Sequence, residues 1–169
     1  CLDHTFQLKI SSCLVNPRAC HETVLNYVPT QHPKKIAVVG GGPAGMAFAH
    51  ISALRGHEVT LYESGPKLGG QFKLAKVIPG KEEYAETIRY YESMMSKYKV
   101  NVCLSQKATG KDLIDNKYDE IILANGVHPR SIDIEGADHP KVVSYVEVLQ
   151  NKVNIGKSVA IIGAGGIGF

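Results

Sequence analysis

Hydrophobic and polar positions along the chain follow two periods in turn, which predicts alternating strands and helices. Short apolar runs rich in β-branched residues, typical of buried parallel strands, cover 35–39, 58–63, 100–104, 118–124 and 158–162. Between the runs, apolar residues recur at spacings of three and four, as on one face of a helix. One such face comprises Ala44, Ala47, Phe48, Ile51 and Leu54, and another comprises Tyr84, Ile88, Tyr91, Met95 and Tyr98. This order of elements indicates an α/β fold with a parallel sheet.

A glycine-rich turn lies between the first strand and the first helix. Gly40, Gly42 and Gly45 have the G-x-G-x-x-G spacing, and Pro43 suits the first helical position, where a missing N–H costs nothing. In a strand–turn–helix context these glycines allow a sharp turn, a close approach of backbone to a diphosphate, and tight packing of helix on strand. We therefore expect a dinucleotide diphosphate at the helix N-terminus, lined by Gly40, Gly42, Pro43, Ala44 and Gly45.

An acidic residue stands where a dinucleotide site needs one. Glu63 ends the second strand, 23 positions after Gly40. A carboxylate at this place in a Rossmann-like fold accepts hydrogen bonds from a ribose. The alternative is an ordinary glycine turn beside a solvated glutamate, and the agreement of strand, helix and acid favours the dinucleotide site.

A second fingerprint, Gly163, Gly165 and Gly168, follows the last apolar run. Two fingerprints suggest an electron path from one dinucleotide to another. The sequence ends at Phe169, before the expected helix and the residue that tells NAD from NADP, so the choice between NADPH and NADH stays open. It begins at Cys1 rather than methionine, and we expect it to be a piece of a longer polypeptide.

The four cysteines, Cys1, Cys13, Cys20 and Cys103, match no complete zinc or cluster pattern by their spacing. We interpret Cys20 and Cys103 as small buried hydrophobic residues. No serine, cysteine or carboxylate is paired with a histidine at a spacing that suggests nucleophilic catalysis, and we assign no catalytic residue.

The composition is that of an ordinary globular α/β protein, with 44% hydrophobic residues, 21% charged residues and a formal net charge of +3. This charge is too mild to indicate a nucleic-acid partner. Neither a signal peptide nor a long apolar stretch is present, so we expect a cytoplasmic protein without a membrane partner.

The motifs together resemble an iron–sulfur flavoenzyme family that includes bacterial NADPH-dependent 2,4-dienoyl-CoA reductase and trimethylamine dehydrogenase. The resemblance rests on the segment from Cys1 to Cys13 followed by Asn16–Cys20, the Gly40 fingerprint, Glu63 with Gly69-Gly70-Gln71, and the closing Gly163 fingerprint. It implies that Cys1 and Cys13 are two ligands of a 4Fe–4S cluster and that Gly70 and Gln71 lie along FAD. Related reductases carry Ala-Thr-Gly at the exit from the FAD fold, where this chain has Ala124, Asn125 and Gly126.

The resemblance also implies a function for the intact enzyme. Electrons would pass from NADPH through FAD and the cluster to FMN, which would reduce a 2,4-dienoyl-CoA in fatty acid β-oxidation; the FMN barrel would precede this chain. An amine dehydrogenase of the trimethylamine type, whose matching domain takes no nicotinamide, is an alternative that the Gly163 fingerprint disfavours. A general NADH:flavin oxidoreductase and a nucleotide-binding module without activity remain further alternatives.

These motifs divide the chain into three expected parts. Residues 1–32 form a cysteine-containing segment, and Pro29–Pro33 is the linker at its boundary with the next part. Residues 33–130 form an incomplete FAD-binding Rossmann-like domain. Residues 131–169 form a crossover and the start of an NAD(P)-binding domain.

Overall fold

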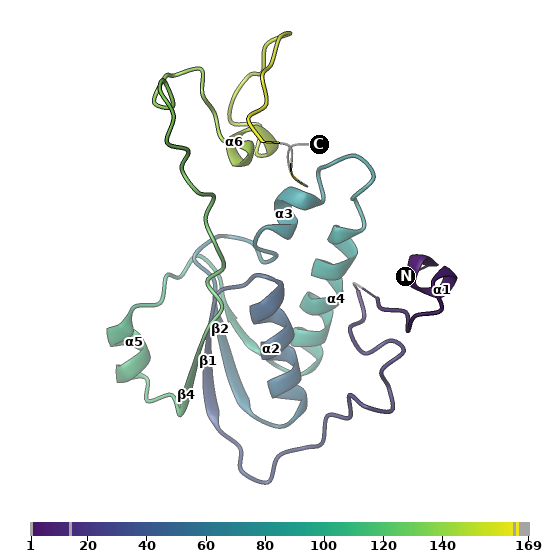
Figure 1. Ribbon diagram of the computed structural model, residues 1–169. Coiled ribbons are helices and arrows are strands. Elements are labelled where there is room, and N and C mark those ends of the chain that lie inside the picture. The colour runs from purple at the N-terminus through teal and green to yellow at the C-terminus, as the bar shows by residue number, and fades with distance from the viewer. Residues whose placement is uncertain (1, 14, 164, 166–169) are drawn as a thin grey trace. The chain divides into compact units, whose positions relative to one another are not determined.

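The computed structural model describes residues 2–13, 15–163 and 165, and divides into two compact units, the first ending at Val127 and the second beginning at His128. The helices and strands (Figure 1) are α1 (Leu2–Phe6), β1 (Lys35–Val39), α2 (Pro43–Leu54), β2 (Glu58–Tyr62), α3 (Phe72–Ala75), α4 (Tyr84–Lys97), β3 (Asn101–Cys103), α5 (Gly110–Asp115), β4 (Glu120–Leu123) and α6 (Tyr145–Leu149). No helix among the described residues is long and apolar enough to cross a membrane.

The first unit is built on a four-stranded parallel sheet with the order β3-β2-β1-β4. β1 lies inside the sheet, so that Val38 is paired with Leu61 of β2 on one side and with Ile122 of β4 on the other. Parallel neighbours require long crossovers, and helices α2, α4 and α5 lie in the three connections. The expected α/β fold with a parallel, Rossmann-like sheet is confirmed.

Alternation along β1 divides the core between the two faces of the sheet. Ile36 and Val38 belong to the larger cluster, which α2 and α4 complete with buried residues such as Met46 and Met95. Ala37 points to the opposite face and joins a small cluster with Leu113 of α5. Figure 1 shows α2 and α4 together and α5 apart from them. The sheet is thus covered fully on one face and sparsely on the other.

The buried face of α2 differs from the face that the spacing predicts. Ala44 and Phe48 of the predicted set are exposed, and the buried residues of this helix are Gly45, Met46, Ala49, His50 and Ser52. The predicted set omits Met46, which is fully buried, and the small residues Gly45 and Ala49 on the same buried face let the helix lie close to the sheet. In α4 the predicted face is confirmed, with Ile88, Tyr91 and Met95 buried.

His50 is a polar residue inside the interface between α2 and α4. Its side chain is 4% exposed, and its ring centroid lies 6.1, 5.7 and 6.4 Å from those of Tyr90, Tyr91 and Tyr98. Burial lowers the pKa of His50, and the Ala47 backbone opposes part of that shift. The ring is therefore held in its neutral form among tyrosines.

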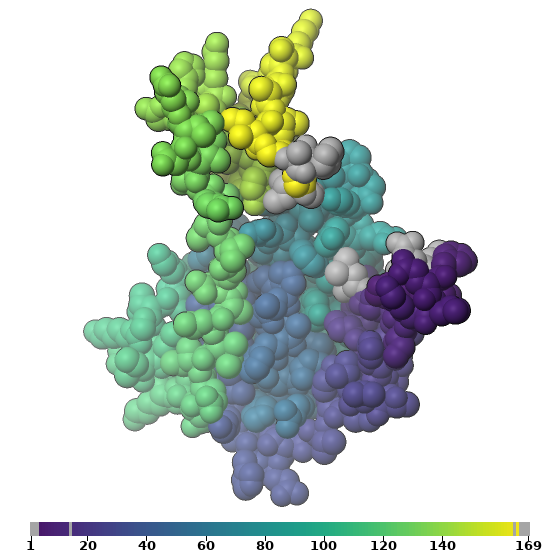
Figure 2. Space-filling view, in the orientation of Figure 1, coloured from purple at the N-terminus to yellow at the C-terminus, as the bar shows by residue number. Residues whose placement is uncertain are grey.

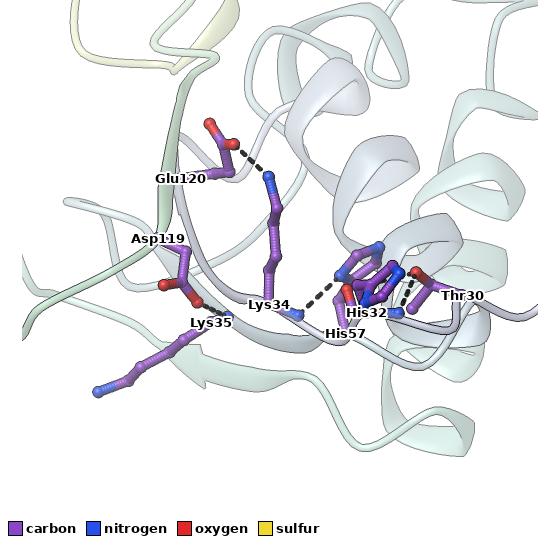
Figure 3. Close-up of polar contacts among 7 residues, drawn as sticks. All are labelled: Thr30, His32, Lys34, Lys35, His57, Asp119 and Glu120. Carbon is purple, nitrogen blue, oxygen red and sulfur yellow. Dashed lines mark hydrogen bonds and ion pairs between the residues drawn. The ribbon is translucent and has the colours of Figure 1, made fainter.

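Polar contacts join three strands at the amino edge of the sheet (Figure 3). Lys34 Nζ lies 2.6 Å from Glu120 Oε1, and the Lys35 N–H donates to Asp119 Oδ2 at 2.7 Å. The Lys34 N–H donates to Nδ1 of His57 at 3.1 Å, just before β2 begins. The exposed ion pair contributes little by itself, and the contacts to backbone N–H groups fix where β1 starts.

The second unit lacks a strand that the sequence predicts. Residues 158–162 form neither helix nor strand, and Val159, Ile161 and Ile162 are 59%, 69% and 64% exposed. The prediction of a strand here is wrong for this structure, because a strand is stable only with neighbours to pair with, and no pairing partner lies beside this run among the described residues. Helix α6 is capped by Ser144, whose hydroxyl accepts from the Glu147 N–H.

The burial of His50 predicts a pH dependence of stability. Because the pKa of the folded ring is lowered, the unfolded chain takes up the proton first as the pH falls below about 6.5, so the free energy of unfolding falls on acidification. In a His50→Leu variant this contribution disappears. We expect urea unfolding at about pH 7.5 and 5.5 to show a smaller loss of stability on acidification than in the wild type. The control His32→Leu removes an exposed histidine and should keep the full loss; equal losses in His50→Leu and the wild type would contradict the assignment.

Candidate functional site

The carboxyl ends of the parallel strands meet at one edge of the first unit. The strands β1, β2 and β4 are followed directly by Gly40, Glu63 and Ala124. Backbone bonds extend the ladder past the strand ends, from Gly40 N–H to Tyr62 O at 2.8 Å and from Ala124 N–H to Val39 O at 2.8 Å. The connections from β1 lead to β2 on one side and, later, to β4 on the other. Ligands of such sheets bind in the crevice at this reversal of strand order.

Glycine is required at two positions of the first fingerprint by close packing. Gly40 has φ +117°, and a Cβ placed on it would lie 2.2 Å from Ala124 O. A Cβ on Gly45 would lie 1.9 Å from Gly40 O. Distances this short cannot be relieved without moving backbone, so the start of α2 is held directly against the ends of β1 and β4.

The amino end of α2 faces this edge without a neutralising side chain. Gly42 is the N-cap, Pro43 is the first helical residue, and the part of the chain that the structure describes supplies neither a side-chain cap nor an acid in the first turn. Helix N-terminal N–H groups carry partial positive charge and lack partners within the helix. Together with the adjacent glycine turn, this end offers donors to an anion such as a diphosphate.

A second glycine loop lies against the first. The Gly69 N–H donates to Gly41 O at 2.8 Å. Gly70 has φ +51°, and a Cβ on it would lie 2.9 Å from the Cα of Gly42. The fingerprint turn and the Gly69-Gly70 loop therefore contact each other through backbone atoms. A side chain at Gly42 or Gly70 would occupy the space between them.

Glu63 joins the two loops through its carboxylate. Its Oε2 accepts from the Gly41 N–H at 2.8 Å, and its Oε1 accepts from the Gly65 N–H at 2.7 Å. The Ser64 hydroxyl also donates to Oε1, at 3.4 Å, whereas Oε2 accepts from Gly41 alone among the described residues and, with room for two hydrogen bonds, retains capacity for a hydroxyl donor. Glu63 lies where a ribose is expected, and it also holds the loops in place. The sequence did not identify Gly41 and Gly65 as its donors, because local spacing does not reveal which backbone N–H groups face a side chain.

The predicted exit segment Ala124-Asn125-Gly126 borders the same edge. Ala124 packs beside Gly40 and Gly45, and Gly126 has φ +74°. From the second loop, Nε2 of Gln71 donates to Val127 O at 3.0 Å. Leu123 and Val127 are 73% and 75% exposed, and the green start of the crossover lies at the surface of the first unit in Figure 2. The structure thus brings the predicted residues of the first fingerprint, Glu63, Gly70, Gln71 and the exit segment to one place.

The predicted cluster ligands are described only in part. Cys1 lies outside the described residues, and Cys13 is a half-buried free thiol whose Sγ accepts from the Asn16 N–H at 3.3 Å. Cys20 is exposed, with φ +64°. Its interpretation as a buried hydrophobic residue is therefore wrong, because it lies in a turn of an open segment. Cys103 is half-buried at the end of β3. Among the described residues, no three His, Cys, Asp or Glu side chains gather as a metal site.

The second fingerprint is also described only in part. Gly163 has φ +109°, and a Cβ on Gly163 or Gly165 would meet no atom within 4 Å. Gly168 lies outside the described residues.

A hollow of about 260 Å³ beside α4 contains none of the predicted site residues; cationic side chains such as Lys76 and Arg89 line part of it.

Comparison with known proteins places this geometry in a family. Residues 34–169 match the pyridine nucleotide-disulphide oxidoreductase family. The chain is 36% identical to a metal reductase of Desulforamulus reducens and 36% identical to a cinnamate reductase of Clostridium sporogenes, covering 99% of this chain in both cases and 26% and 25% of those proteins. Among solved structures, a 2-naphthoyl-CoA reductase in complex with 2-naphthoyl-CoA has a TM-score of 0.89 and 36% identity, over 99% of this chain and 26% of that chain.

The chain therefore spans about a quarter of the length of the relatives it matches. Their similarity extends over nearly all of its residues, and the family match begins one residue before β1 and includes both glycine fingerprints. Three findings agree: the fold, this match, and the glycine edge, by which we mean the carboxyl ends of β1, β2 and β4 with their adjoining glycine loops. The chain belongs to the pyridine nucleotide-disulphide oxidoreductase family, as an FAD/NAD(P)-binding domain.

Proposed function

We propose that this chain is the FAD- and NAD(P)-binding part of an iron–sulfur flavin oxidoreductase. In the intact enzyme, electrons from NADPH or NADH would reach an unsaturated acyl-CoA, such as a 2,4-dienoyl-CoA, by way of FAD, a 4Fe–4S cluster and FMN. The observation that carries the proposal is the glycine edge. There Glu63 accepts hydrogen bonds from backbone N–H groups of two glycine loops, beside an uncapped helix N-terminus. The reductase names of the similar proteins support it.

The residues present fit a flavin dinucleotide. Side chains at Gly42 and Gly70 would fill the space between the loops, and the N-terminal N–H groups of α2 suit a diphosphate. In this proposal Gly40, Gly42, Pro43, Ala44, Gly45 and Gly70 surround the diphosphate, and Ala124, Asn125 and Gly126 border the same crevice. Bound FAD supplies the two-electron and one-electron chemistry. The chain supplies binding and orientation, and Glu63 accepts from the ribose hydroxyls.

The nicotinamide dinucleotide is assigned to the second fingerprint. Its three glycines, Gly163, Gly165 and Gly168, have the spacing that lets backbone approach a diphosphate. In the proposed domain division, residues 1–32 contribute to the cluster site, residues 33–130 bind FAD, and residues 131–169 bind the nicotinamide dinucleotide. Cys1 and Cys13 are proposed as cluster ligands. The Asn16 N–H donates to Cys13 Sγ at 3.3 Å, so this sulfur already accepts one backbone hydrogen bond.

The first prediction from this proposal concerns FAD. A Glu63→Ala change in the intact enzyme removes the acceptor for the ribose and for two loop N–H groups, and should weaken FAD binding by about 1–3 kcal/mol. Flavin absorbance retained after gel filtration measures the effect. Glu58→Ala, at the opposite end of β2 and exposed, is the matched control and should retain FAD. Equal retention by Glu63→Ala and Glu58→Ala would refute the role of Glu63.

The second prediction concerns the nicotinamide. In the intact enzyme, Gly165→Val should block the approach of backbone to the diphosphate, so that NADPH no longer reduces bound FAD in anaerobic stopped-flow measurements. FAD content should stay unchanged, because Gly165 belongs to the second unit. Gly156→Val, where an added Cβ also meets nothing within 4 Å, is the control. Reduction at the wild-type rate in Gly165→Val would leave this motif an ordinary glycine turn.

The third prediction concerns iron. A Cys13→Ser change in the intact enzyme should remove most of the bound iron, since a 4Fe–4S cluster needs four ligands and a serine hydroxyl is a poor substitute for a thiolate. Iron analysis after anaerobic purification is the measurement. Cys20→Ser, in the same segment but outside the proposed ligand set, should keep its iron. A full iron content in Cys13→Ser would show that this thiol is not a ligand.

A further inference from the structure

The crossover that leaves β4 is held by a side chain from a distant loop. The last ladder bond is the one from Ala124 N–H to Val39 O, at 2.8 Å. Beyond it, in residues 125–133, all of which the structure describes, a single hydrogen bond is present: Nε2 of Gln71 donates to Val127 O at 3.0 Å. That bond joins residues 56 positions apart in the sequence.

Packing does little to hold this segment. Val127 is 75% exposed, and a Cβ on Gly126 would meet no atom within 4 Å. Gly126 has φ +74°, a conformation that suits a change of chain direction. Val127 is also the last residue of the first unit. The hydrogen bond from Gln71 therefore acts at the point where the chain leaves the sheet for the second unit.

The donor is itself fixed by the glycine edge. Gln71 follows Gly70, which lies against Gly42, and the Gly69 N–H is bonded to Gly41 O at 2.8 Å. A shift of the Gly69-Gly70 loop would move the Gln71 backbone with it. The crossover and the Gly69-Gly70 loop are thus linked through the side-chain amide of Gln71.

We propose that Gln71 is a positioning residue that ties the crossover to the second glycine loop. Its amide holds the exit of the chain at the carboxyl edge, and so couples the loop beside FAD to the crossover that leads to the proposed nicotinamide-binding residues. The coupling to hydride transfer rests on the proposed function. The tie itself rests on the hydrogen bond from Gln71 to Val127 and on the lack of other bonds in residues 125–133.

The test compares Gln71→Met, which keeps the length of the side chain without a donor, and Gln71→Glu, which keeps its shape but turns a carboxylate toward the Val127 carbonyl. Loss of the hydrogen bond that holds Val127 should speed limited trypsin cleavage after Arg130 in the intact enzyme by about three- to tenfold, more in the Glu variant. Gln31→Met and Gln31→Glu, at an exposed glutamine for which the structure shows no side-chain hydrogen bond, are the matched controls.

A functional readout separates positioning from mere local order. With FAD still bound, the rate of flavin reduction at saturating NADPH should fall in both Gln71 variants, while the NADPH concentration for half-maximal rate changes little. An unchanged cleavage rate would overturn the tie, and faster cleavage with wild-type reduction rates would overturn the coupling. If the wild type bound no FAD, the proposed function would fail, and the comparison of cleavage rates would still decide the tie.

Discussion

The close approach of three backbone segments at the carboxyl edge is the constraint on which the rest of the site depends. A Cβ at Gly45 would lie 1.9 Å from Gly40 O, and one at Gly40 would lie 2.2 Å from Ala124 O. The start of α2 can reach the ends of β1 and β4 only because no side chain stands between them. This contact aims the helix N-terminus at the crevice where the strand order reverses, and both conditions together make the edge suitable for a diphosphate.

Backbone N–H groups provide the chemistry of this edge, and one carboxylate organises them. Glu63 accepts from Gly41 and Gly65, so it aligns both loops before any ligand arrives. Such preorganisation lowers the ordering cost of binding. Of the two carboxylate oxygens, Oε2 accepts a single hydrogen bond within the part of the chain that the structure describes and keeps capacity for a further donor. If Glu63 binds a ribose as proposed, the same residue would also maintain the loops proposed for the diphosphate.

The two edges of the sheet have different tasks. At the amino edge, Lys34, Asp119 and Glu120 tie β1 to β4 through side chains (Figure 3), which aligns the strands. At the carboxyl edge, glycine and backbone dominate, leaving room for a ligand. Gln71 extends the second edge to the crossover through Val127. Side-chain contacts that align the strands and the glycine turns of the proposed site therefore lie at opposite ends of the same strands.

The sequence by itself determined the parallel α/β fold, the turn at Gly40 and the place of Glu63, because strand period, glycine spacing and the acid after the second strand are local properties. It did not determine which face of α2 is buried, since that depends on the space left by α4 and the sheet. His50 is buried because tyrosines from another helix surround it, and residues 158–162 form no strand because none of the residues that the structure describes pairs with them. The partners of Glu63 and Gln71 were likewise decided only by the tertiary structure, which brings together hydrogen-bonding groups from loops far apart in the chain.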